Sequence, residues 1–258
     1  MTDRYFDQMG AHFARKIYTS PKGSIRLAVL TRDLQEWLPD IQQPEQSLRI
    51  LDAGAGLGHI SEWLLAQGHR LTLCEPSIEM LEAARAHLDA LPSAYPVEYL
   101  QLPLQALPAR GEQYDLVICH AVLEWLADPA AALKALQQLC LPSGALSLAF
   151  YNRDALVYKN LIKGQFRKLE KNQLAGSKRS LTPQQPLDPR EVQQWINQAG
   201  LTTHKLSGIR VFYDYMPVEF QAQATEAQII EAELQYSRHP AYAALGRYLH
   251  HWLRPTQD

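Results

Sequence analysis

The chain lacks the features that mark secreted, zinc-bound and membrane-spanning proteins. Its 258 residues include only three cysteines, each inside an apolar run and far from the other two. Neither a disulfide framework nor a metal site is therefore expected, and the thiols should be buried in a core. No apolar run approaches the length that spans a bilayer, and residues 1–15 lack the apolar centre of a signal peptide. We expect a cytoplasmic protein with no membrane partner and no obligatory protein partner.

A large excess of charge is also missing, except in one segment. The whole chain has a formal net charge of −2, whereas residues 153–180 hold eight basic and two acidic residues, a net charge of +6. Four cations there recur every four positions, which predicts a stripe along one helix: Lys159, Lys163, Arg167 and Lys171. The other side of that helix is expected to pack on the core through Leu156, Leu161, Ile162 and Phe166. Such a stripe suits a phosphate backbone, and a solvated helix face is the alternative.

Apolar runs of strand length alternate with amphipathic runs of helix length. The expected strands are 49–53, 70–74, 97–101, 116–120 and 145–151, and the expected helices are 60–67, 78–88 and 129–140. This alternation indicates an α/β fold with a mostly parallel, doubly wound, Rossmann-like sheet that binds ligands at the carboxyl ends of its strands. After a further helix from Asp188 to Ala199, the segments Thr202 to Leu206 and Ile209 to Tyr215 are expected to close the sheet as a hairpin.

The strongest functional signal is a glycine-rich turn after the first expected strand. Residues Asp52 to Gly58 have the pattern D-x-G-x-G-x-G, and Glu75 ends the next strand, where it could hold two ribose hydroxyls. Because glycine lacks a Cβ, a ligand can lie against bare backbone beside the first N–H groups of the following helix. A dinucleotide site would instead read G-x-G-x-x-G, and Asp52 would repel a pyrophosphate but attract a cation. An unspecialised turn, or a site for another nucleotide, is the alternative.

These residues resemble the first motif of the class I S-adenosyl-L-methionine-dependent methyltransferases. The resemblance implies a seven-stranded sheet with an antiparallel C-terminal hairpin, and S-adenosyl-L-methionine as the cofactor. It also implies that Leu104 and Gln105 lie near adenine, with His120 at the same edge of the sheet. A D/N-P-P-aromatic motif and a Pro-Cys pair are both missing, which argues against amino-group methylation and against covalent attack on a pyrimidine ring.

Further motifs recur together over nearly the whole chain. They are Arg4-Tyr5-Phe6-Asp7, Ile17-Tyr18, Lys22-Gly23, His120-Ala121-Val122-Leu123-Glu124-Trp125, Phe150-Tyr151-Asn152, Gly208-Ile209-Arg210-Val211-Phe212 and Leu245-Gly246-Arg247-Tyr248. Together they resemble the bacterial tRNA 5-carboxymethoxyuridine methyltransferases. The resemblance implies esterification of the carboxylate of 5-carboxymethoxyuridine at the wobble position (34) of a tRNA anticodon loop. We expect one methyltransferase domain over 1–258, with a mainly helical cap at 1–47 and a basic insertion at 153–180.

The resemblance also implies a set of residues around the cofactor. With the two members that the glycine-rich turn adds, the set is Arg26, Asp52, Gly54, Ala55, Gly56, Glu75, Leu104, Gln105 and His120. The family often has glycine where this chain has Ala55, so the backbone there must not need a conformation that only glycine adopts. Without the resemblance, His120 would be interpreted as a core histidine and Arg26 as a surface cation.

The substrate side is expected to need cations more than a general base. A carboxyl group with a pKa of about 4 is already ionised at neutral pH, so no catalytic residue is assigned. Arg210 or Arg247 is expected to hold the carboxylate through forked donors, and Tyr151 to shape the pocket or stack on the uracil. The expected contacts with anticodon-loop phosphates are Lys163, Arg167 and Lys171.

Two other functions are compatible with the same cofactor turn. One is a small-molecule methyltransferase acting on a free carboxylic acid or a quinone precursor, which leaves the basic segment unexplained. The other is a non-catalytic RNA-binding module that retains the cofactor pocket.

Overall fold

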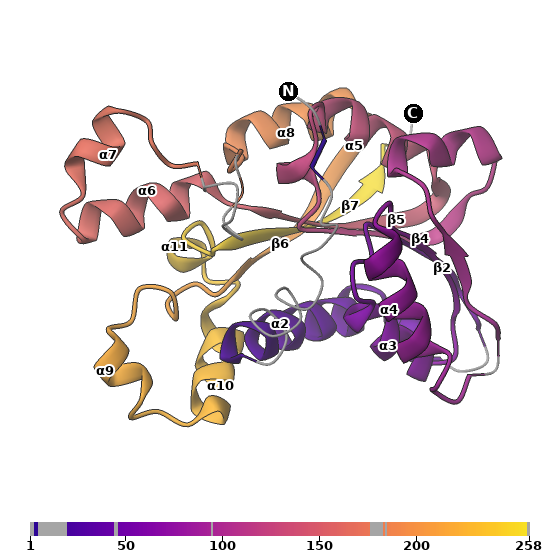
Figure 1. The fold of residues 1–258 in the computed structure, drawn as a ribbon, viewed down its shortest axis with the longest axis horizontal. Coiled ribbons are helices and arrows are strands. Elements are labelled where there is room, and N and C mark those ends of the chain that lie inside the picture. The colour runs from indigo at the N-terminus through magenta and orange to yellow at the C-terminus, as the bar shows by residue number, and fades with distance from the viewer. Residues whose placement is uncertain are drawn as a thin grey trace.

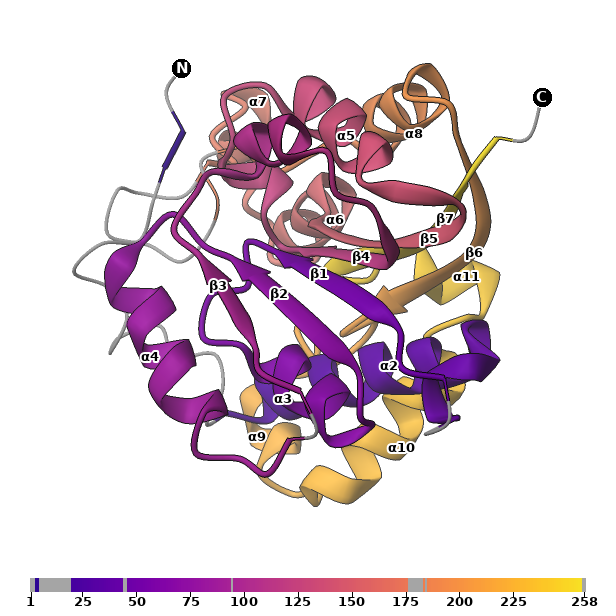
Figure 2. The same ribbon diagram turned by 90° about the vertical axis from the view of Figure 1, so that its right-hand side faces the viewer.

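The computed structural model describes residues 3–4, 20–43, 46–93, 95–175, 183 and 185–256, and a seven-stranded sheet forms its centre (Figures 1 and 2). The strands are β1 (Arg49–Ala53), β2 (Arg70–Cys74), β3 (Glu98–Leu100), β4 (Tyr114–His120), β5 (Cys140–Tyr151), β6 (Leu201–Ile209) and β7 (Tyr248–Pro255). Their order across the sheet is β3-β2-β1-β4-β5-β7-β6. The β3-β2-β1-β4-β5 neighbours are parallel, and β7 runs antiparallel to both β5 and β6. The predicted fold class is confirmed.

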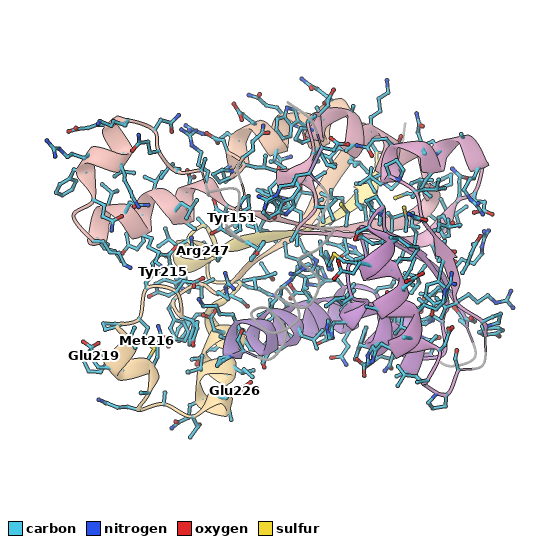
Figure 3. All side chains as sticks on the ribbon, viewed as in Figure 1. Tyr151, Tyr215, Met216, Glu219, Glu226 and Arg247 are labelled. Atoms are coloured by element: carbon cyan, nitrogen blue, oxygen red, sulfur yellow. The ribbon has the colours of Figure 1, made fainter. Side chains whose placement is uncertain are left out.

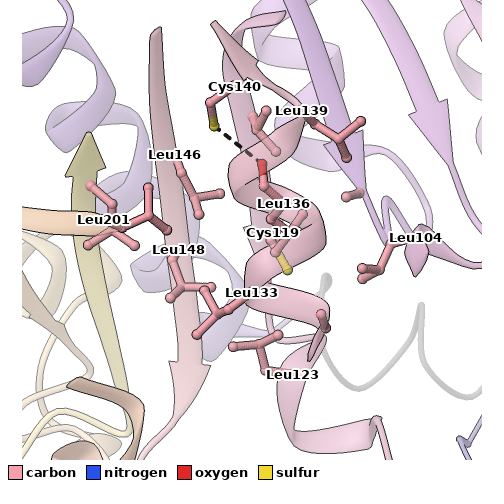
Figure 4. Packing of buried hydrophobic residues seen from close by; sticks show 14 of the residues in the cluster. Leu104, Cys119, Leu123, Leu133, Leu136, Leu139, Cys140, Leu146, Leu148 and Leu201 are labelled. Carbon is pink, nitrogen blue, oxygen red and sulfur yellow. Dashed lines mark hydrogen bonds between the residues drawn. The ribbon is translucent and has the colours of Figure 1, made fainter. Parts of the chain in front are cut away.

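Helices cover both faces of the sheet and enclose two apolar cores. One core packs the sheet against α2 (Pro21–Trp37), α3 (His59–Ala66) and α4 (Ile78–Leu88). The other lies between the sheet and α5 (Pro129–Gln138), α8 (Pro189–Gln198) and the 3₁₀ helix η3 (Leu104–Arg110). In Figure 4 the thiol of Cys140 in this second core donates to the Leu136 carbonyl, 3.4 Å away. All three cysteines are buried, as expected.

Side-chain caps explain why several helices begin where the sequence predicts. Ser77 accepts a hydrogen bond from the Met80 N–H at the start of α4. Asp128 and Asp188 cap α5 and α8, each followed by a proline in the first turn. These residues satisfy N–H groups that have no partner inside the helix, and the fixed φ of proline suits its first turn.

The predicted C-terminal hairpin is correct in being antiparallel and wrong in its second segment. The partner of β6 is β7 (Tyr248–Pro255), whereas 210–215 is not a strand. Arg210 has φ +59°, which turns the chain out of the sheet. The Glu233 carboxylate then accepts the N–H groups of Val211 and Tyr213, so these donors are not available to a strand ladder. The helices α9 (Val218–Gln221), α10 (Glu226–Tyr236) and α11 (Pro240–Ala243) fill the connection.

The predicted basic helix is also wrong, because it is two helices. Helix α6 (Arg153–Ile162) ends before a turn at Gly164, whose φ is +64°, and α7 (Phe166–Glu170) follows. The four cations therefore do not form one helical stripe. Of the predicted core-facing side chains only Leu156 is buried, whereas Leu161, Ile162 and Phe166 are 45%, 51% and 59% exposed. In Figure 1, α6 and α7 project together from one side of the sheet, and we call them the α6–α7 arm.

The helical cap expected at 1–47 is described only in part. Helix α2 and the 3₁₀ helix η2 (Pro39–Gln42) account for most of 20–43, and the motif residues 5–7 and 17–18 lie outside the described residues. The part of the insertion at 176–180 also lies outside them. Among the described residues, no helix combines the length and the apolar character needed to cross a membrane.

A close backbone contact positions the segment that leads into β7. A Cβ on Gly246 would lie 2.6 Å from the Gly208 Cα and 2.8 Å from the Ile209 nitrogen, distances that no side chain can occupy. The contact lets the Arg247 N–H donate to the Arg210 carbonyl over 3.3 Å. Glycine at 246 therefore places two arginines side by side.

We expect Gly246→Ala to lower the free energy of unfolding by about 3 kcal/mol, because the added methyl meets backbone atoms that cannot move aside. Gly200→Ala is the matched control, since Gly200 has φ +69° but no atom within 4 Å of the place where a methyl would stand, so that only about 1 kcal/mol of left-handed strain is expected. Urea denaturation of both variants measures the difference. Equal losses would show that the close contact is not what requires glycine at 246.

Candidate active site

One pocket at the carboxyl ends of β1, β2 and β4 brings together all nine residues predicted to surround a cofactor. Arg26 enters it from α2, the glycine-rich turn and Glu75 form its floor, and η3 and His120 complete the wall. Parallel pairing in register explains this convergence, because Ile50, Leu51 and Asp52 pair with Leu116, Val117 and Ile118. The carboxyl ends of both strands therefore open at the same edge.

The turn after β1 has the geometry that its glycines predict. Gly54, Gly56 and Gly58 have φ values of +77°, +58° and +75°. A Cβ on Gly54 would lie 2.4 Å from a methyl of Val122, so a larger residue would collide as well as strain the backbone. Ala55 does not adopt a positive φ, and this explains how alanine fits a position where glycine is common. The Gly54 N–H donates to the Cys74 carbonyl over 2.7 Å and ties the turn to β2.

Two carboxylates line the floor of the pocket. Glu75 accepts the Gly56 N–H at one oxygen and the Ser77 N–H at the other, both at 3.0 Å, so its orientation is fixed in advance. Asp52 is 3% exposed and accepts the Ser61 hydroxyl at 2.7 Å. Burial raises the pKa of Asp52 to about 6, and the charge of Glu75 adds to the rise. A cation placed beside Asp52 would relieve this cost.

Arg26 and His120 meet at the opposite wall. An Arg26 Nη2 donates to the His120 carbonyl over 3.4 Å, and the guanidinium lies 5.5 Å from the centre of the Tyr248 ring. His120 is 7% exposed, and its Nε2 lies 2.8 Å from the Ser147 hydroxyl. Arg26 is therefore not a plain surface cation, and His120 faces the pocket from the core.

Much of the apolar lining escaped the sequence analysis. It includes Leu27, Leu30, Ile60, Met80, Val122 and Trp125. Apolar residues at helical spacing look the same whether they face a core or a pocket, so periodicity could not separate them. Residues 3 and 4 also reach this wall: Asp3 accepts the Gln105 amide at 3.2 Å, and the Arg4 guanidinium lies 5.1 Å from the Trp125 ring.

A second group of polar side chains surrounds Asp214 and contains both arginines predicted to hold a carboxylate. The Nε atoms of Arg247 and Arg210 lie 3.1 and 2.9 Å from Asp214 Oδ2. Lys22 Nζ lies 3.8 Å from Asp214 Oδ1. Arg247 also donates to the Tyr151 hydroxyl over 3.3 Å. In Figure 3, Tyr151, Arg247 and Tyr215 are labelled close together between the α6–α7 arm and α9. We call Lys22, Lys159, Arg210, Arg247 and Asp214 the cation cluster.

Positive charge dominates the cation cluster. Burial alone would raise the pKa of Asp214, but Arg210, Arg247, Lys22 and Lys159 outweigh it and hold that pKa below its usual value. One carboxylate thus faces four cations. The Arg210 Nε is buried and close to Asp214 but has no aligned hydrogen bond among the described residues. The cluster therefore has an excess of positive charge that would attract an anion.

Tyr248 joins the cation cluster to the pocket. Its ring lies 5.5 Å from the Arg26 guanidinium and 5.4 Å from that of Arg210. Tyr151 packs edge-on against it with ring centres 5.2 Å apart. An anion held by Arg210 would consequently lie next to a ligand held by Arg26.

The other predicted substrate contacts lie outside the pocket. Lys163, Arg167 and Lys171 are exposed on the α6–α7 arm and do not line the pocket. Among the described residues, no three His, Cys, Asp or Glu side chains gather in a metal-binding arrangement.

Comparison with known proteins agrees with this geometry. Residues 51–148 match the family model described as a methyltransferase domain. The chain is 35% identical to the tRNA 5-carboxymethoxyuridine methyltransferase of Escherichia coli (strain K12), covering 100% of this chain and 98% of the relative. It is 29% identical to the ubiquinone biosynthesis O-methyltransferase of Alkalilimnicola ehrlichii over 76% of this chain and 75% of that relative.

A solved structure also shares the fold. The magnesium protoporphyrin IX methyltransferase of Synechocystis PCC 6803, with bound SAH, superposes with a TM-score of 0.66 at 16% identity and covers 98% of this chain and 97% of its own. Together with the full-length similarity to the Escherichia coli enzyme, these findings show that the chain belongs to the tRNA 5-carboxymethoxyuridine methyltransferases, a family of class I S-adenosylmethionine-dependent methyltransferases.

Proposed function

We propose that this enzyme transfers a methyl group from S-adenosylmethionine to the carboxylate of 5-carboxymethoxyuridine at wobble position 34 of a tRNA, forming the methyl ester. The observation that carries this proposal is the cation cluster beside the pocket. A carboxylate substrate requires a buried positive site next to the methyl donor, and the guanidinium groups of Arg210 and Arg26 lie 5.4 and 5.5 Å from the centre of the same Tyr248 ring. The full-length similarity to the Escherichia coli enzyme supports the tRNA substrate.

The pocket residues suit each part of S-adenosylmethionine. Glu75, held by two backbone N–H groups, is placed to accept both ribose hydroxyls. The bare turn from Gly54 to Gly56 gives room for the nucleoside, and Leu104 lies at the edge where adenine would pack. Asp52 supplies negative charge for the cationic methionine end. S-adenosylmethionine then contributes the reactive methyl group, and the chain supplies position and charge.

The reaction needs little acid–base chemistry from the protein. An ionised carboxylate oxygen would take the methyl group of the bound donor, with the C–S bond breaking as the C–O bond forms and S-adenosylhomocysteine leaving beside the ester. The task of Arg210 and Arg247 is to hold the carboxylate and leave one oxygen free to attack. Tyr151 is 7% exposed and engages Arg247 and Tyr248, which favours pocket shaping over base stacking.

The α6–α7 arm supports an RNA substrate. It presents Lys163, Arg167 and Lys171 to solvent, together with apolar side chains that are 45% to 59% exposed. Cations can fix phosphates of an anticodon loop, and exposed rings such as Phe166 can stack on unpaired bases. A tRNA substrate also supports a cytoplasmic location.

The competing substrate class is a small quinone precursor, as the ubiquinone O-methyltransferase relatives suggest. Incubation with labelled S-adenosylmethionine and either bulk tRNA or a pool of small metabolites separates the two. We expect label in tRNA that mild alkali releases as methanol, because an ester is hydrolysed and an ether is not. Label confined to metabolites would refute the tRNA proposal.

Arg210→Ala should lower kcat/KM on tRNA by about tenfold to a hundredfold, the effect of losing a hydrogen bond to a charged group. The affinity for S-adenosylmethionine should change less than twofold, because Arg210 does not line the pocket. Arg190→Ala is the control, since that arginine is 84% exposed and pairs with Asp188. Methyl transfer measures activity, and calorimetry measures cofactor binding. Equal losses of both would remove Arg210 from the substrate site.

Replacing Lys163, Arg167 and Lys171 together by alanine should weaken tRNA binding. It should also lower the slope of log affinity against log salt by about two to three, because each phosphate contact releases roughly one counterion. A matched triple variant removes exposed cations from other elements: Lys134, Lys205 and Arg254. If both variants show the wild-type slope in filter-binding titrations, the arm does not contact RNA phosphates.

The affinity for S-adenosylmethionine should depend on the ionisation of Asp52. Because its pKa is raised to about 6, Asp52 is mostly ionised at pH 7.5 and mostly protonated at pH 5. A cationic ligand should therefore bind about tenfold more weakly at pH 5 than at pH 7.5. Asp52→Asn should bind weakly at both values with little pH dependence. A variant that keeps the wild-type pH profile in calorimetric titrations would assign the dependence to another group.

A further inference from the structure

A chain of buried polar side chains runs from α2 across three strands to the wall of the pocket. His120 on β4 and His250 on β7 both stand in register with Ala149 on the intervening strand β5. The small side chain of Ala149 lets the two imidazoles lean together, with ring centres 5.5 Å apart and nearly perpendicular planes. Ser147, two residues earlier on β5, lies on the same face and fits between the rings.

The hydrogen bonds in this chain are short and continuous. Asp33 Oδ2 lies 2.8 Å from His250 Nδ1, and His250 Nε2 lies 2.8 Å from the Ser147 hydroxyl. The same hydroxyl lies 2.8 Å from His120 Nε2. Asp33, Ser147 and His250 are fully buried. Each group therefore depends on its neighbour, since water does not reach them.

The charges around Asp33 decide which groups donate and which accept along these hydrogen bonds. Arg32 and Arg238 both contact Asp33 Oδ1, at 2.6 and 2.7 Å, and Arg238 also pairs with Glu36. Burial would raise the pKa of Asp33, but its hydrogen bond to His250 and these arginines hold the pKa below its usual value. The positive charges of the two arginines already balance the negative charges of Asp33 and Glu36. An additional charge on the buried His250, which stacks on Trp37 at 5.0 Å, would be uncompensated.

With His250 neutral, only one assignment of hydrogen-bond donors and acceptors fits the four side chains. Its Nδ1–H donates to Asp33, and its Nε2 accepts the Ser147 O–H. The Ser147 oxygen must then accept from His120, so the proton of His120 resides on Nε2. The opposite ring nitrogen, Nδ1, is buried and has no hydrogen-bond partner among the described residues, and the His120 residue itself lines the pocket.

We propose that Asp33, His250 and Ser147 are positioning residues that hold His120 as the Nε2–H tautomer and present its bare Nδ1 as an acceptor to the cationic end of the methyl donor. The inference rests on the donor pocket described above and deepens the role of that site. The Nδ1 lone pair can accept a polarised hydrogen of the ammonium or of the groups on sulfur. The other tautomer would point an N–H at a cation and repel it.

The surroundings of His120 keep the ring neutral. Burial lowers the pKa of His120 well below its usual value, and the positive charge of Arg26 from α2 lowers it further. His59 also lines the pocket and has a lowered pKa, chiefly through burial. The lone pair therefore remains available across the neutral pH range.

The wild-type protein tests the proposal directly. Two-bond ¹H–¹⁵N correlations on protein labelled with ¹⁵N-histidine distinguish the Nδ1–H, Nε2–H and doubly protonated forms, and His120→Asn assigns the signal. We expect His120 as Nε2–H in the free protein at neutral pH. An Nδ1–H or doubly protonated ring would overturn the proposal, whatever any variant does.

Ser147→Ala tests whether the tautomer matters for binding. It should release His120 from the single tautomer and weaken S-adenosylmethionine binding about threefold to tenfold by calorimetry, the effect of one hydrogen bond. Thr203→Val is the matched control, because Thr203 on β6 contacts His251 Nδ1 at 3.3 Å on the other face of the sheet. It should change neither the His120 signal nor the affinity.

Unchanged affinity and tautomer in Ser147→Ala would contradict the positioning role, and thermal unfolding of both variants checks that each is folded. Neither measurement uses tRNA. Failure of the tRNA proposal would therefore leave these results in place, and failure of these results would leave tRNA methylation intact.

Discussion

Parallel pairing of β1 with β4 is the constraint on which the site depends. It opens the carboxyl ends of both strands at one edge, with β2 and β5 extending the sheet on either side. Asp52, Glu75 and His120 come from three different strands or strand ends and still face one pocket. The glycine-rich turn completes the arrangement because its bare backbone packs against Val122, where any side chain at 54 would collide.

The second half of the site depends on long-range contacts that no local pattern encodes. Gly246 and Gly208 meet backbone to backbone, and Asn152 donates to the carbonyls of Ala244 and Gly246 at 2.9 Å each. These contacts bring Arg247 beside Arg210 although 36 positions separate them in the sequence. Arg210 itself has a positive φ, a strained conformation for a non-glycine residue that fits a functional position.

The sequence predicts the parallel part of the fold well because its signals are local. Strand periodicity, the caps Ser77, Asp128 and Asp188, and the glycine spacing each act within a few residues. The hairpin prediction was wrong because Glu233 takes the N–H groups of Val211 and Tyr213, which lie 22 and 20 residues before it in the sequence. The basic helix was wrong because Gly164 ends α6, a choice that a four-residue charge repeat does not reveal.

The candidate site shows the same division between local and long-range information. The nine cofactor residues could be named because the resemblance to a known family implies seven of them and the glycine-rich turn adds two, and the structure gathers all nine in one pocket. The partners that set their chemistry could not be named. Ser147 and His250 are ordinary strand residues in the sequence, and only the register of β4, β5 and β7 brings them to His120. Asp214 lies four residues after Arg210, but it pairs with Arg247 only because the long connection after β6 returns the chain to this place.

The two carboxylates of the pocket floor and the two arginines of the cation cluster lie in different parts of the site, which suits the charges of the two reactants. The floor of the pocket carries Asp52 and Glu75, whereas the cation cluster places Arg210 and Arg247 beyond the Tyr248 ring. If these groups lay in contact, they would neutralise one another as buried ion pairs and leave little field for a ligand. The Tyr248 ring lies close to the guanidinium groups of both Arg26 and Arg210, one at the pocket and one in the cation cluster. A cationic donor and an anionic acceptor can therefore each find its complement while their reactive atoms meet beside the same ring.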